Sequence, residues 1–215
     1  KFYKNKRVLI TGNTGFKGAW ITLMLNCLGA RVMGYSLAEM SKPNMFELLK
    51  LKNNIRHISG DINDFSKVKK EFDKFKPQII IHLAAQSIVR LSYKKPLETF
   101  STNILGSANI LEYSRHCKSL KSLIYVTSDK CYENNENNKA YKESDRIGGS
   151  DPYSASKAAA ENLFSSYLKS FFVFNKFGAS TVRSGNVIGG GDWSVDRIIP
   201  DIIKSLKKKK NLIVR

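Results

Sequence analysis

The sequence contains no apolar run of the roughly eighteen residues that a membrane-spanning helix needs. Residues 1–7 are basic and polar and lack the apolar segment of a secretory signal. Hydrophobic residues nevertheless make up 42% of the 215 positions, which is enough for one sizeable core. We therefore expect a soluble globular domain in the cytoplasm, with no membrane partner.

Cysteine is also scarce. The chain has three cysteines, an odd number, and Cys27, Cys117 and Cys131 are far apart in the sequence. This pattern argues against a disulfide framework and against a metal cluster. We expect reduced thiols and no metal site.

Acidic residues are few compared with basic ones. The chain carries 36 Lys and Arg against 18 Asp and Glu, a formal net charge of +18. Such a balance raises nucleic acid as a partner. The basic residues are scattered, however, with one run at Lys207–Lys210 and no interleaved aromatic residues. We do not expect a nucleic acid partner, because a compositionally biased genome and a positive cleft for an anionic small molecule are sufficient explanations.

The stretch Val8–Gly18 (V-L-I-T-G-N-T-G-F-K-G) indicates a buried strand, a glycine turn and the start of a helix. In such a turn Gly12 allows a tight bend, Gly15 lets the backbone approach a phosphate, and Gly18 lets the helix pack against the strand. A pyrophosphate then binds at the helix N-terminus. The predicted apolar face of this helix consists of Trp20, Ile21, Met24, Leu25 and Leu28.

The second predicted strand, Arg31–Tyr35, lacks the acidic residue that usually binds the adenosine ribose in dinucleotide folds. Ser36 follows the strand, and the nearest carboxylate is Glu39. The residues alone therefore leave NAD and NADP both open.

Further apolar runs predict strands that alternate with helices. The predicted strands are Arg56–Ser59, Ile79–Leu83 and Leu123–Val126, and the predicted helical segments contain Phe65, Val68, Phe72 and Phe75 or span Pro96–Cys117. Residues 41–54 are polar and predict an irregular excursion. Parallel strands need crossover helices, so the fold class is α/β, a Rossmann-type doubly wound parallel sheet with its ligand crevice at the carboxyl ends of the strands.

Two groups of polar residues are predicted to lie at that crevice. Asp61 has two interpretations, a hydrogen bond to the adenine amino group or a helix N-terminal cap. Ser128, Asp129 and Lys130 follow the Leu123–Val126 strand. The small residues Ala84 and Ala85 would let a cofactor lie against the sheet.

Tyr153 and Lys157 are one helical turn apart, after a helix start at Pro152. A lysine ammonium close to a phenol is expected to lower the phenol pKa and make it a usable base. Tyr153 could then take a proton from a hydroxyl group while the carbon beneath gives hydride to a nicotinamide, with Ser128 bonded to the same oxygen.

Together these motifs resemble the extended short-chain dehydrogenase/reductase family over essentially the whole chain. Within that family H-L-A-A-Q-S-I-V-R-L-S-Y, V-T-S-D-K-C-Y-E-N, D-P-Y-S-A-S-K and R-S-G-N-V-I-G-G-G-D-W are similar to the sugar-nucleotide 4,6-dehydratases that act on CDP-glucose. The resemblance implies cofactor contacts at Gly12, Thr14, Gly15, Phe16, Lys17, Gly18, Asp61, Ile62, Leu83, Ala84, Ala85, Gln86, Asn103, Tyr153 and Lys157. It implies substrate contacts at Ser87, Arg90, Ser128, Asn186 and Arg197, and catalysis by Ser128, Asp129, Lys130, Tyr153 and Lys157.

The resemblance also implies NAD, CDP-glucose and internal redox. Hydride leaves sugar C4 as Tyr153 takes the hydroxyl proton, water leaves C6 with Asp129 as acid, and the hydride returns to C6. The Pro96–Cys117 and Ser154–Leu168 helices, with Ala108, Ala158, Ala159, Ala160 and Leu163, are expected to form a homodimer. Residues 1–183 would be the NAD-binding domain and 184–215 the beginning of a truncated substrate-binding region, with a strand starting at Ile213–Arg215.

Two alternatives remain open. One is a sugar-nucleotide 4-epimerase, or a dehydratase with another nucleotide, which would not need Asp129 and Lys130. The other is a catalytically silent dinucleotide-binding protein, which would not need Ser128, Tyr153 and Lys157.

Overall fold

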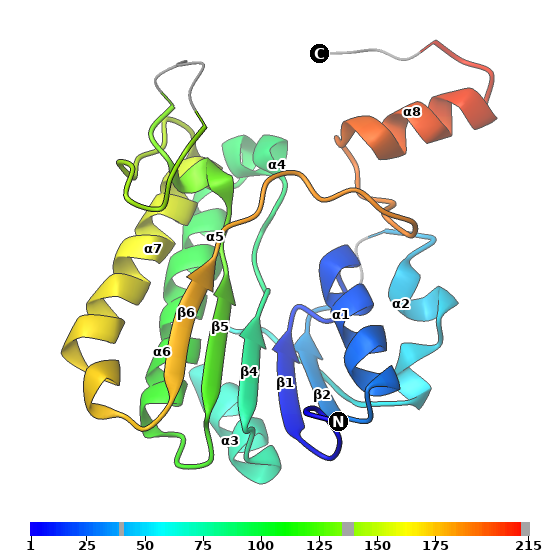
Figure 1. The fold of residues 1–215 in the computed structure, drawn as a ribbon. Helices are drawn as coiled ribbons and strands as arrows, with labels where there is room; N and C mark the ends of the chain where they lie inside the picture. Colours follow the sequence, from blue (N-terminus) through cyan, green and yellow to red (C-terminus); the bar gives the residue numbers. More distant parts are fainter. Residues whose placement is uncertain (39–40, 135–139, 212–215) are drawn as a thin grey trace.

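The computed structural model of the chain describes residues 1–38, 41–134 and 140–211. Six parallel strands form one sheet in the order β3-β2-β1-β4-β5-β6 (Figure 1). The strands are β1 Arg7–Thr11, β2 Arg31–Ser36, β3 Arg56–Ser59, β4 Ile79–His82, β5 Ser122–Val126 and β6 Gly178–Val182. The order reverses between β1 and β4, so the carboxyl ends of these two strands flank the crevice where doubly wound sheets bind ligands. The predicted fold class is confirmed.

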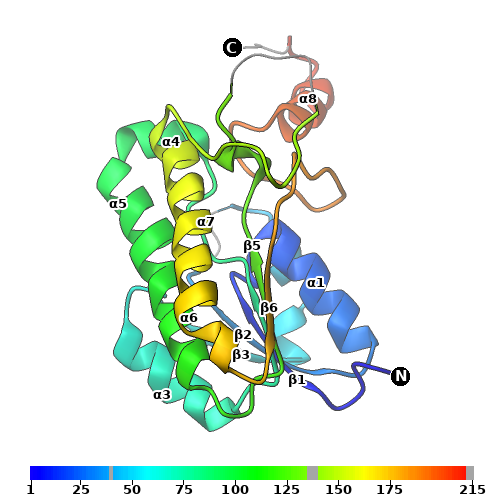
Figure 2. The ribbon, with the colours of Figure 1, turned by 60° about the vertical axis from the view of Figure 1, so that its left-hand side comes forward.

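Helices cover the two faces of the sheet. The helices α3, α5, α6 and α7 lie on one face, and α1 lies on the other (Figure 2). The bounds are α1 Phe16–Cys27, α2 Met45–Leu48, α3 Phe65–Phe75, α4 Val89–Lys94, α5 Pro96–Phe100, α6 Ser107–His116, α7 Pro152–Ser170 and α8 Ile198–Lys207. In the described part of the chain, no helix is both long and apolar enough to cross a bilayer.

The central strands β1, β2 and β4 are buried on both faces, as their continuous apolar runs predict, whereas the edge strands β3 and β6 are not. Along β1, Leu9 points into the core beneath α3, α6 and α7, whereas Val8 and Ile10 point into the core beneath α1. All three side chains are fully buried. Burial of each stabilises the fold by about 1.5–3 kcal/mol.

The face that α1 turns to the protein differs from the predicted one. Trp20, Met24 and Leu28 are 46%, 52% and 45% exposed. Of the predicted face, Leu25 is buried and Ile21 is half-buried against the core, and the other buried residues are Gly18, Ala19 and Thr22. Small side chains let the helix axis approach the sheet closely, and this turns the large apolar residues outward.

Three other segments differ from the sequence analysis. Residues 41–54 contain α2 and a 3₁₀ turn, Leu51–Asn53, with Met45, Phe46 and Leu51 buried. The predicted Pro96–Cys117 helix contains a π-helical stretch at Ser101–Gly106 and ends at His116. Strand β6 was not predicted. Glu39 and the predicted strand start at Ile213–Arg215 lie outside the described residues.

After β6 the chain leaves the sheet. Residues 183–197, which we call the strap, cross above the carboxyl ends of the strands, and α8 stands away from the body (Figure 1). The Trp20 indole donates to the Gly190 carbonyl at 3.0 Å. The Arg90 guanidinium pairs with Asp196 at 2.9 Å. These contacts fix the strap to α1 and to α4.

Candidate active site

The glycine turn between β1 and α1 has the geometry that its sequence predicts. Gly12 has φ +73°, and a Cβ there would lie 2.7 Å from the Ala84 nitrogen. A Cβ on Gly18 would overlap the Gly12 carbonyl oxygen, whereas a Cβ on Gly15 would meet only that oxygen, at 3.5 Å. Gly12 and Gly18 are therefore required by the fold, and Gly15 faces open space.

The N-terminus of α1 suits a phosphate. Gly15 is the N-cap, no side chain caps the helix, and its first turn has no acidic residue. The first N–H groups of a helix have no intrahelical partner, and the helix dipole favours an anion there. The residues present therefore fit the pyrophosphate of a dinucleotide.

Thr14 and Ser36 connect this turn to the end of β2. The Thr14 hydroxyl donates to the Leu37 carbonyl at 3.0 Å and lies 2.9 Å from the Ser36 hydroxyl. Ser36 in turn donates to the Asn13 side chain at 3.0 Å. These hydroxyls hold the backbone of the turn in place.

Two residues predicted to bind the cofactor are used inside the protein instead. Asn103 is 1% exposed, accepts from the Gln86 N–H at 2.8 Å and donates to the Gln86 carbonyl and the Ser156 hydroxyl. The Gln86 side chain donates to Thr99 and accepts from the Ile88 N–H. Both amides hold the loop after β4 against α7, so the Asn103 side chain has no free group for a cofactor.

The predictions for Asp61 and Ile62 also need correction. Ile62 is 3% exposed and belongs to the core, so its side chain cannot contact a cofactor. Asp61 accepts from the Asn63 N–H at 2.9 Å, whereas Asp64 caps α3. The helix-cap interpretation of Asp61 is wrong, and its adenine contact stays a prediction.

Leu83 and Ala84 follow β4, and their N–H groups donate to the Thr11 hydroxyl at 3.2 Å.

Ser128, Tyr153 and Lys157 come together at the carboxyl end of β5. All three are buried, at 7%, 8% and 4% exposure. The Ser128 hydroxyl is close enough to the Tyr153 phenol to lower its pKa, and the Lys157 ammonium lies 5.8 Å from the centre of the Tyr153 ring. Asp151 caps α7 by accepting from the Tyr153 N–H at 2.9 Å, which fixes the start of the helix.

The electrostatics differ from the prediction. Burial raises the pKa of the Tyr153 phenol, and this outweighs the lowering by Ser128 and Arg197. Burial, together with the Lys17 ammonium, lowers the pKa of Lys157 to about 8. The predicted lowering of the Tyr153 pKa by Lys157 is therefore wrong for the protein alone, because desolvation of the phenolate costs more than nearby charges return.

The side chains of Asp129 and Lys130 pair with each other although the two residues are neighbours in the sequence. Asp129 accepts from the Ser128 hydroxyl at 3.1 Å and from the Lys130 ammonium at 3.3 Å. A 3₁₀ turn at Asp129–Cys131 takes the chain out of the β5 direction and brings both side chains together. Lys130 remains 52% exposed.

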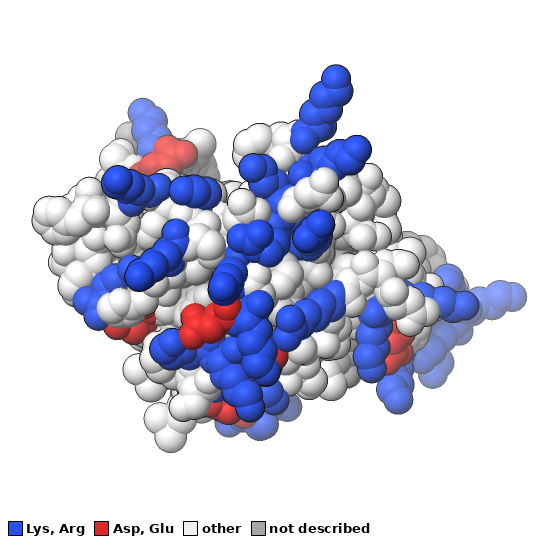
Figure 3. All heavy atoms as spheres, turned by 90° about the horizontal axis from the view of Figure 1, so that it is seen from below, with Lys and Arg blue, Asp and Glu red and all other residues white. Residues whose placement is uncertain are grey.

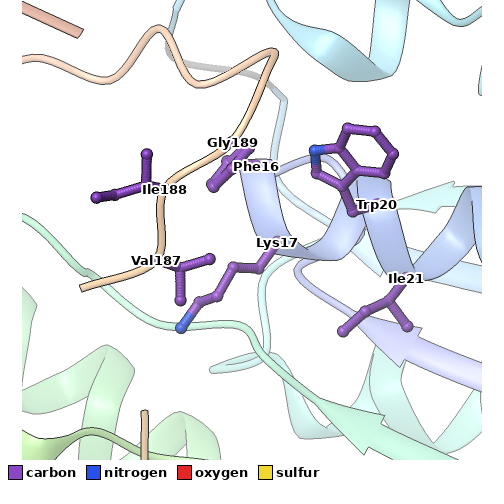
Figure 4. Close-up of a pocket in the computed structure, with 7 residues that line it drawn as sticks. All are labelled: Phe16, Lys17, Trp20, Ile21, Val187, Ile188 and Gly189. Carbon is purple, nitrogen blue, oxygen red and sulfur yellow. The ribbon is translucent and has the colours of Figure 1, made fainter. Parts of the chain in front are cut away.

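A crevice of about 440 Å³ lies between α1 and the strap (Figure 4). Its lining residues are Phe16, Lys17, Trp20, Ile21, Val187, Ile188 and Gly189. The Lys17 ammonium donates to the Ser184 hydroxyl at 3.3 Å. The pKa of Lys17 is lowered overall, because burial and the Arg197 charge lower it more than the Asp129 charge raises it. Lys17 therefore connects the glycine turn with the acid–base residues.

The predicted substrate residues lie on the strap and near α4. Arg197 is half-buried, 3.7 Å from Asp192, and close enough to Tyr153 to influence its pKa. Asn186 and Ser87 are exposed. The ion pair of Arg90 with Asp196 places it beside the strap.

The sequence analysis missed two buried groups. Glu161, one turn beyond Lys157 on α7, accepts from Thr127, from Thr181 and from the Arg183 guanidinium. It thereby joins the ends of β5 and β6 to α7. Its spacing of eight residues from Tyr153 could have placed it on the same helix face as Tyr153 and Lys157 from the sequence alone. His82 lies between Thr11 at 2.6 Å and Ser107 at 3.0 Å, and burial lowers its pKa to about 3, so the ring is neutral.

With this geometry, comparisons with known proteins become informative. A model of the GDP-mannose 4,6 dehydratase family matches residues 9–214. The chain belongs to this family. It is 45% identical over 219 residues to a CDP-glucose 4,6-dehydratase from Salmonella typhimurium, covering 100% of this chain and 61% of the relative. It is 32% identical to a dTDP-D-glucose 4,6-dehydratase from Dictyostelium discoideum, covering 97% and 50%.

A solved structure supports the fold. The UDP-glucose 4-epimerase from Thermus thermophilus, in complex with NAD, matches with a TM-score of 0.76 and 28% identity over 88% of this chain and 58% of that chain. The chain thus spans about half to three fifths of the length of these relatives.

Proposed function

We propose that the protein is an NAD-dependent sugar-nucleotide 4,6-dehydratase acting on CDP-glucose. It would form the 4-keto-6-deoxy sugar nucleotide by internal redox and loss of water, in the cytoplasm, for the deoxysugars of a surface polysaccharide. The observation that carries the proposal is the convergence of Ser128, Tyr153 and Lys157 with Asp129 and Lys130 beside the glycine turn. The 45% identity to a CDP-glucose 4,6-dehydratase supports the same substrate.

In this proposal Tyr153 takes the proton of the sugar 4-hydroxyl, and Ser128 hydrogen-bonds the same oxygen. The Lys157 ammonium, 5.8 Å from the centre of the Tyr153 ring, would offset part of the cost of burying the phenolate. For elimination, a proton would pass from the Lys130 ammonium to the Asp129 carboxylate within their ion pair. Asp129 would then give that proton to the departing 6-hydroxyl, and the neutral Lys130 amine would remove the proton at C5, after which its ammonium would stabilise the enolate. NAD, held at Gly15 and the N-terminus of α1, supplies a reversible hydride acceptor.

Product analysis tests the proposal and separates the alternatives. The protein is incubated with NAD and with CDP-, dTDP-, GDP- or UDP-glucose, and the alkali-induced absorbance of a 4-keto-6-deoxy product is measured. We expect the 4-keto-6-deoxy product with CDP-glucose and not with the other three sugar nucleotides. A 4-hydroxyl epimer without loss of water would instead favour a 4-epimerase, and NAD binding without any product would favour a silent dinucleotide-binding protein.

We also propose that residues 184–215 begin the substrate-binding region, after an NAD-binding domain of residues 1–183. The strap leaves the sheet after β6 (Figure 1), contains Asn186 and Arg197, and lines the crevice with Val187 and Ile188. This position suits contacts with the diphosphate of the substrate.

Finally, we propose a homodimer through the helical run 96–116 and α7. Ala158 and Ala160 are buried within the chain, but Leu97 and Leu105 on the helical run are 84% and 63% exposed. Leu105→Glu should therefore convert a dimer into a monomer, because a charge would be desolvated at the interface. Light scattering measures the mass, and Leu206→Glu, at an exposed leucine on α8, is the matched control. A monomeric unsubstituted protein at micromolar concentration contradicts the proposal.

A further inference from the structure

The positive charge is concentrated away from the candidate active site. Six segments lead into the amino ends of the six strands: residues 1–7, 29–31, 50–56, 74–78, 115–122 and 169–178. They contain no Asp or Glu, and their basic residues are Lys1, Lys4, Lys6, Arg7, Arg31, Lys50, Lys52, Arg56, Lys74, Lys76, Arg115, Lys118, Lys121, Lys169 and Lys176. We call these segments the basic edge. Figure 3 shows this face with Lys and Arg spread over it and few acidic residues.

Backbone hydrogen bonds hold most of these segments side by side. The Arg31 N–H donates to the Lys6 carbonyl, and the Gln78 N–H donates to the Arg7 carbonyl, both at 2.8 Å. The Lys121 N–H donates to the Gln78 carbonyl at 2.8 Å, and the Gly178 N–H to the Lys121 carbonyl at 3.1 Å. Five of the six segments are therefore held side by side at the amino edge of the sheet.

Neither the fold nor the candidate active site accounts for this concentration. Basic residues are favoured in the last turn of an α-helix, but among those of the basic edge only Lys74, Arg115 and Lys169 lie in such a turn. The crevice for an anionic substrate lies at the opposite edge of the sheet. Several basic residues there pair with carboxylates, including Lys130 with Asp129, Arg183 with Glu161 and Arg197 with Asp192. A positive cleft for the substrate therefore leaves the basic residues at the amino ends of the strands unexplained.

An apolar tip projects from the basic edge. In the 3₁₀ turn Phe172–Phe174, Val173 is 60% exposed and Phe174 is 82% exposed. Phe172 is buried against Phe164 and Phe177 and anchors the turn. Lys169 and Lys176 flank the tip. Exposed apolar residues between lysines are typical of segments that enter the boundary between lipid headgroups and acyl chains.

We propose that the basic edge docks the protein on an anionic lipid surface, with Val173 and Phe174 inserted between headgroups. The basic residues are mostly lysines, and each lysine near an anionic membrane surface contributes to the electrostatic attraction. Arginines, which read nucleic acid bases by paired hydrogen bonds, are mostly engaged within the protein. Arg7 donates to the Lys76 carbonyl, Arg56 pairs with Glu71, and Arg115 pairs with Glu112. This proposal replaces the sequence-based expectation of no membrane partner and leaves the crevice facing away from the bilayer.

Vesicle sedimentation of the 215-residue chain tests the proposal. We expect binding to phosphatidylcholine vesicles that contain phosphatidylglycerol, no binding to phosphatidylcholine alone, and release by salt. Lys121→Glu with Lys176→Glu should weaken the binding at least about tenfold, because each lysine near an anionic membrane contributes separately. The matched control, Lys208→Glu with Lys210→Glu beyond α8, changes the charge equally and should retain most of the binding.

Two further variants complete the test. Val173→Ser with Phe174→Ser should make the remaining binding more sensitive to salt, because only the electrostatic attraction is left. Lys121→Gln with Lys176→Gln gives a milder change if the glutamate variant fails to show a native circular dichroism spectrum. Equal binding to neutral vesicles, or equal losses in the edge and control variants, would overturn the proposal. Tighter binding to duplex DNA than to the anionic vesicles would also overturn it, in favour of a nucleic acid partner.

Discussion

Gly15→Val is expected to abolish most NAD binding while leaving the fold intact. A side chain at Gly15 meets only the Gly12 carbonyl oxygen, at 3.5 Å, and the Gly15 backbone, with φ −67° and ψ 164°, suits any residue. The added methyl groups would occupy the space in which a phosphate approaches the N-terminus of α1. Loss of one charge-assisted hydrogen bond alone costs about 1.5–3 kcal/mol, which is roughly 10- to 100-fold in affinity. Calorimetric titration with NAD gives the affinity.

Gly18→Ala provides the contrast for this measurement. Its Cβ would overlap the Gly12 carbonyl oxygen, so the helix or the turn has to shift. We expect this variant to lose stability, as seen in a lower melting temperature, together with NAD affinity. If Gly15→Val bound NAD as tightly as the unsubstituted protein, the glycine turn would not be the cofactor site. A melting temperature that fell as far in Gly15→Val as in Gly18→Ala would show that the fold also needs Gly15.

Asp129→Asn and Lys130→Ala are expected to block elimination and spare the first oxidation. Asp129 and Lys130 form an ion pair next to the Ser128 hydroxyl on the turn after β5, whereas Tyr153 and Lys157 lie on α7. Removal of a general acid or base slows its step by about 10²-fold or more. Rapid mixing with CDP-glucose should therefore show NADH accumulating without the 6-deoxy product.

Tyr153→Phe is the matched control, because it removes the base for the first step and should prevent NADH formation altogether. If Lys130→Ala turned over at the unsubstituted rate, Lys130 would have no role in the chemistry. Its 52% exposure would then reflect an ordinary surface lysine.

Local patterns allowed much of the fold to be predicted. The strands β1 to β5, the three glycines and the Tyr153–Lys157 spacing all depend on residues close in sequence, and each was found there. Strand β6 was missed because G-A-S-T-V has no apolar alternation, and it forms by pairing with β5. The buried face of α1 could not be predicted fully from the sequence. The small residues Gly18 and Ala19 face the sheet, and Trp20 and Met24 face outward.

The candidate site shows the same limit. A polar residue near the crevice can bind a ligand or hold the protein together, and only its partners decide which. Asn103 was expected to bind the cofactor, but Gln86 and Ser156 occupy its amide. The basic edge likewise becomes visible only when segments from six parts of the chain lie side by side.

The strap has a thermodynamic consequence under the proposed function. It touches the cofactor helix through Ser184 and Gly190, and it carries Asn186 and Arg197 toward the substrate. One segment therefore forms a wall shared by two ligands. If one ligand changes how the strap binds the other by a given factor, the second must change the affinity of the first by that same factor. If a sugar nucleotide under the strap raises the affinity for the dinucleotide, the dinucleotide must raise the affinity for the sugar nucleotide by the same factor, and each ligand then stabilises the binding of the other.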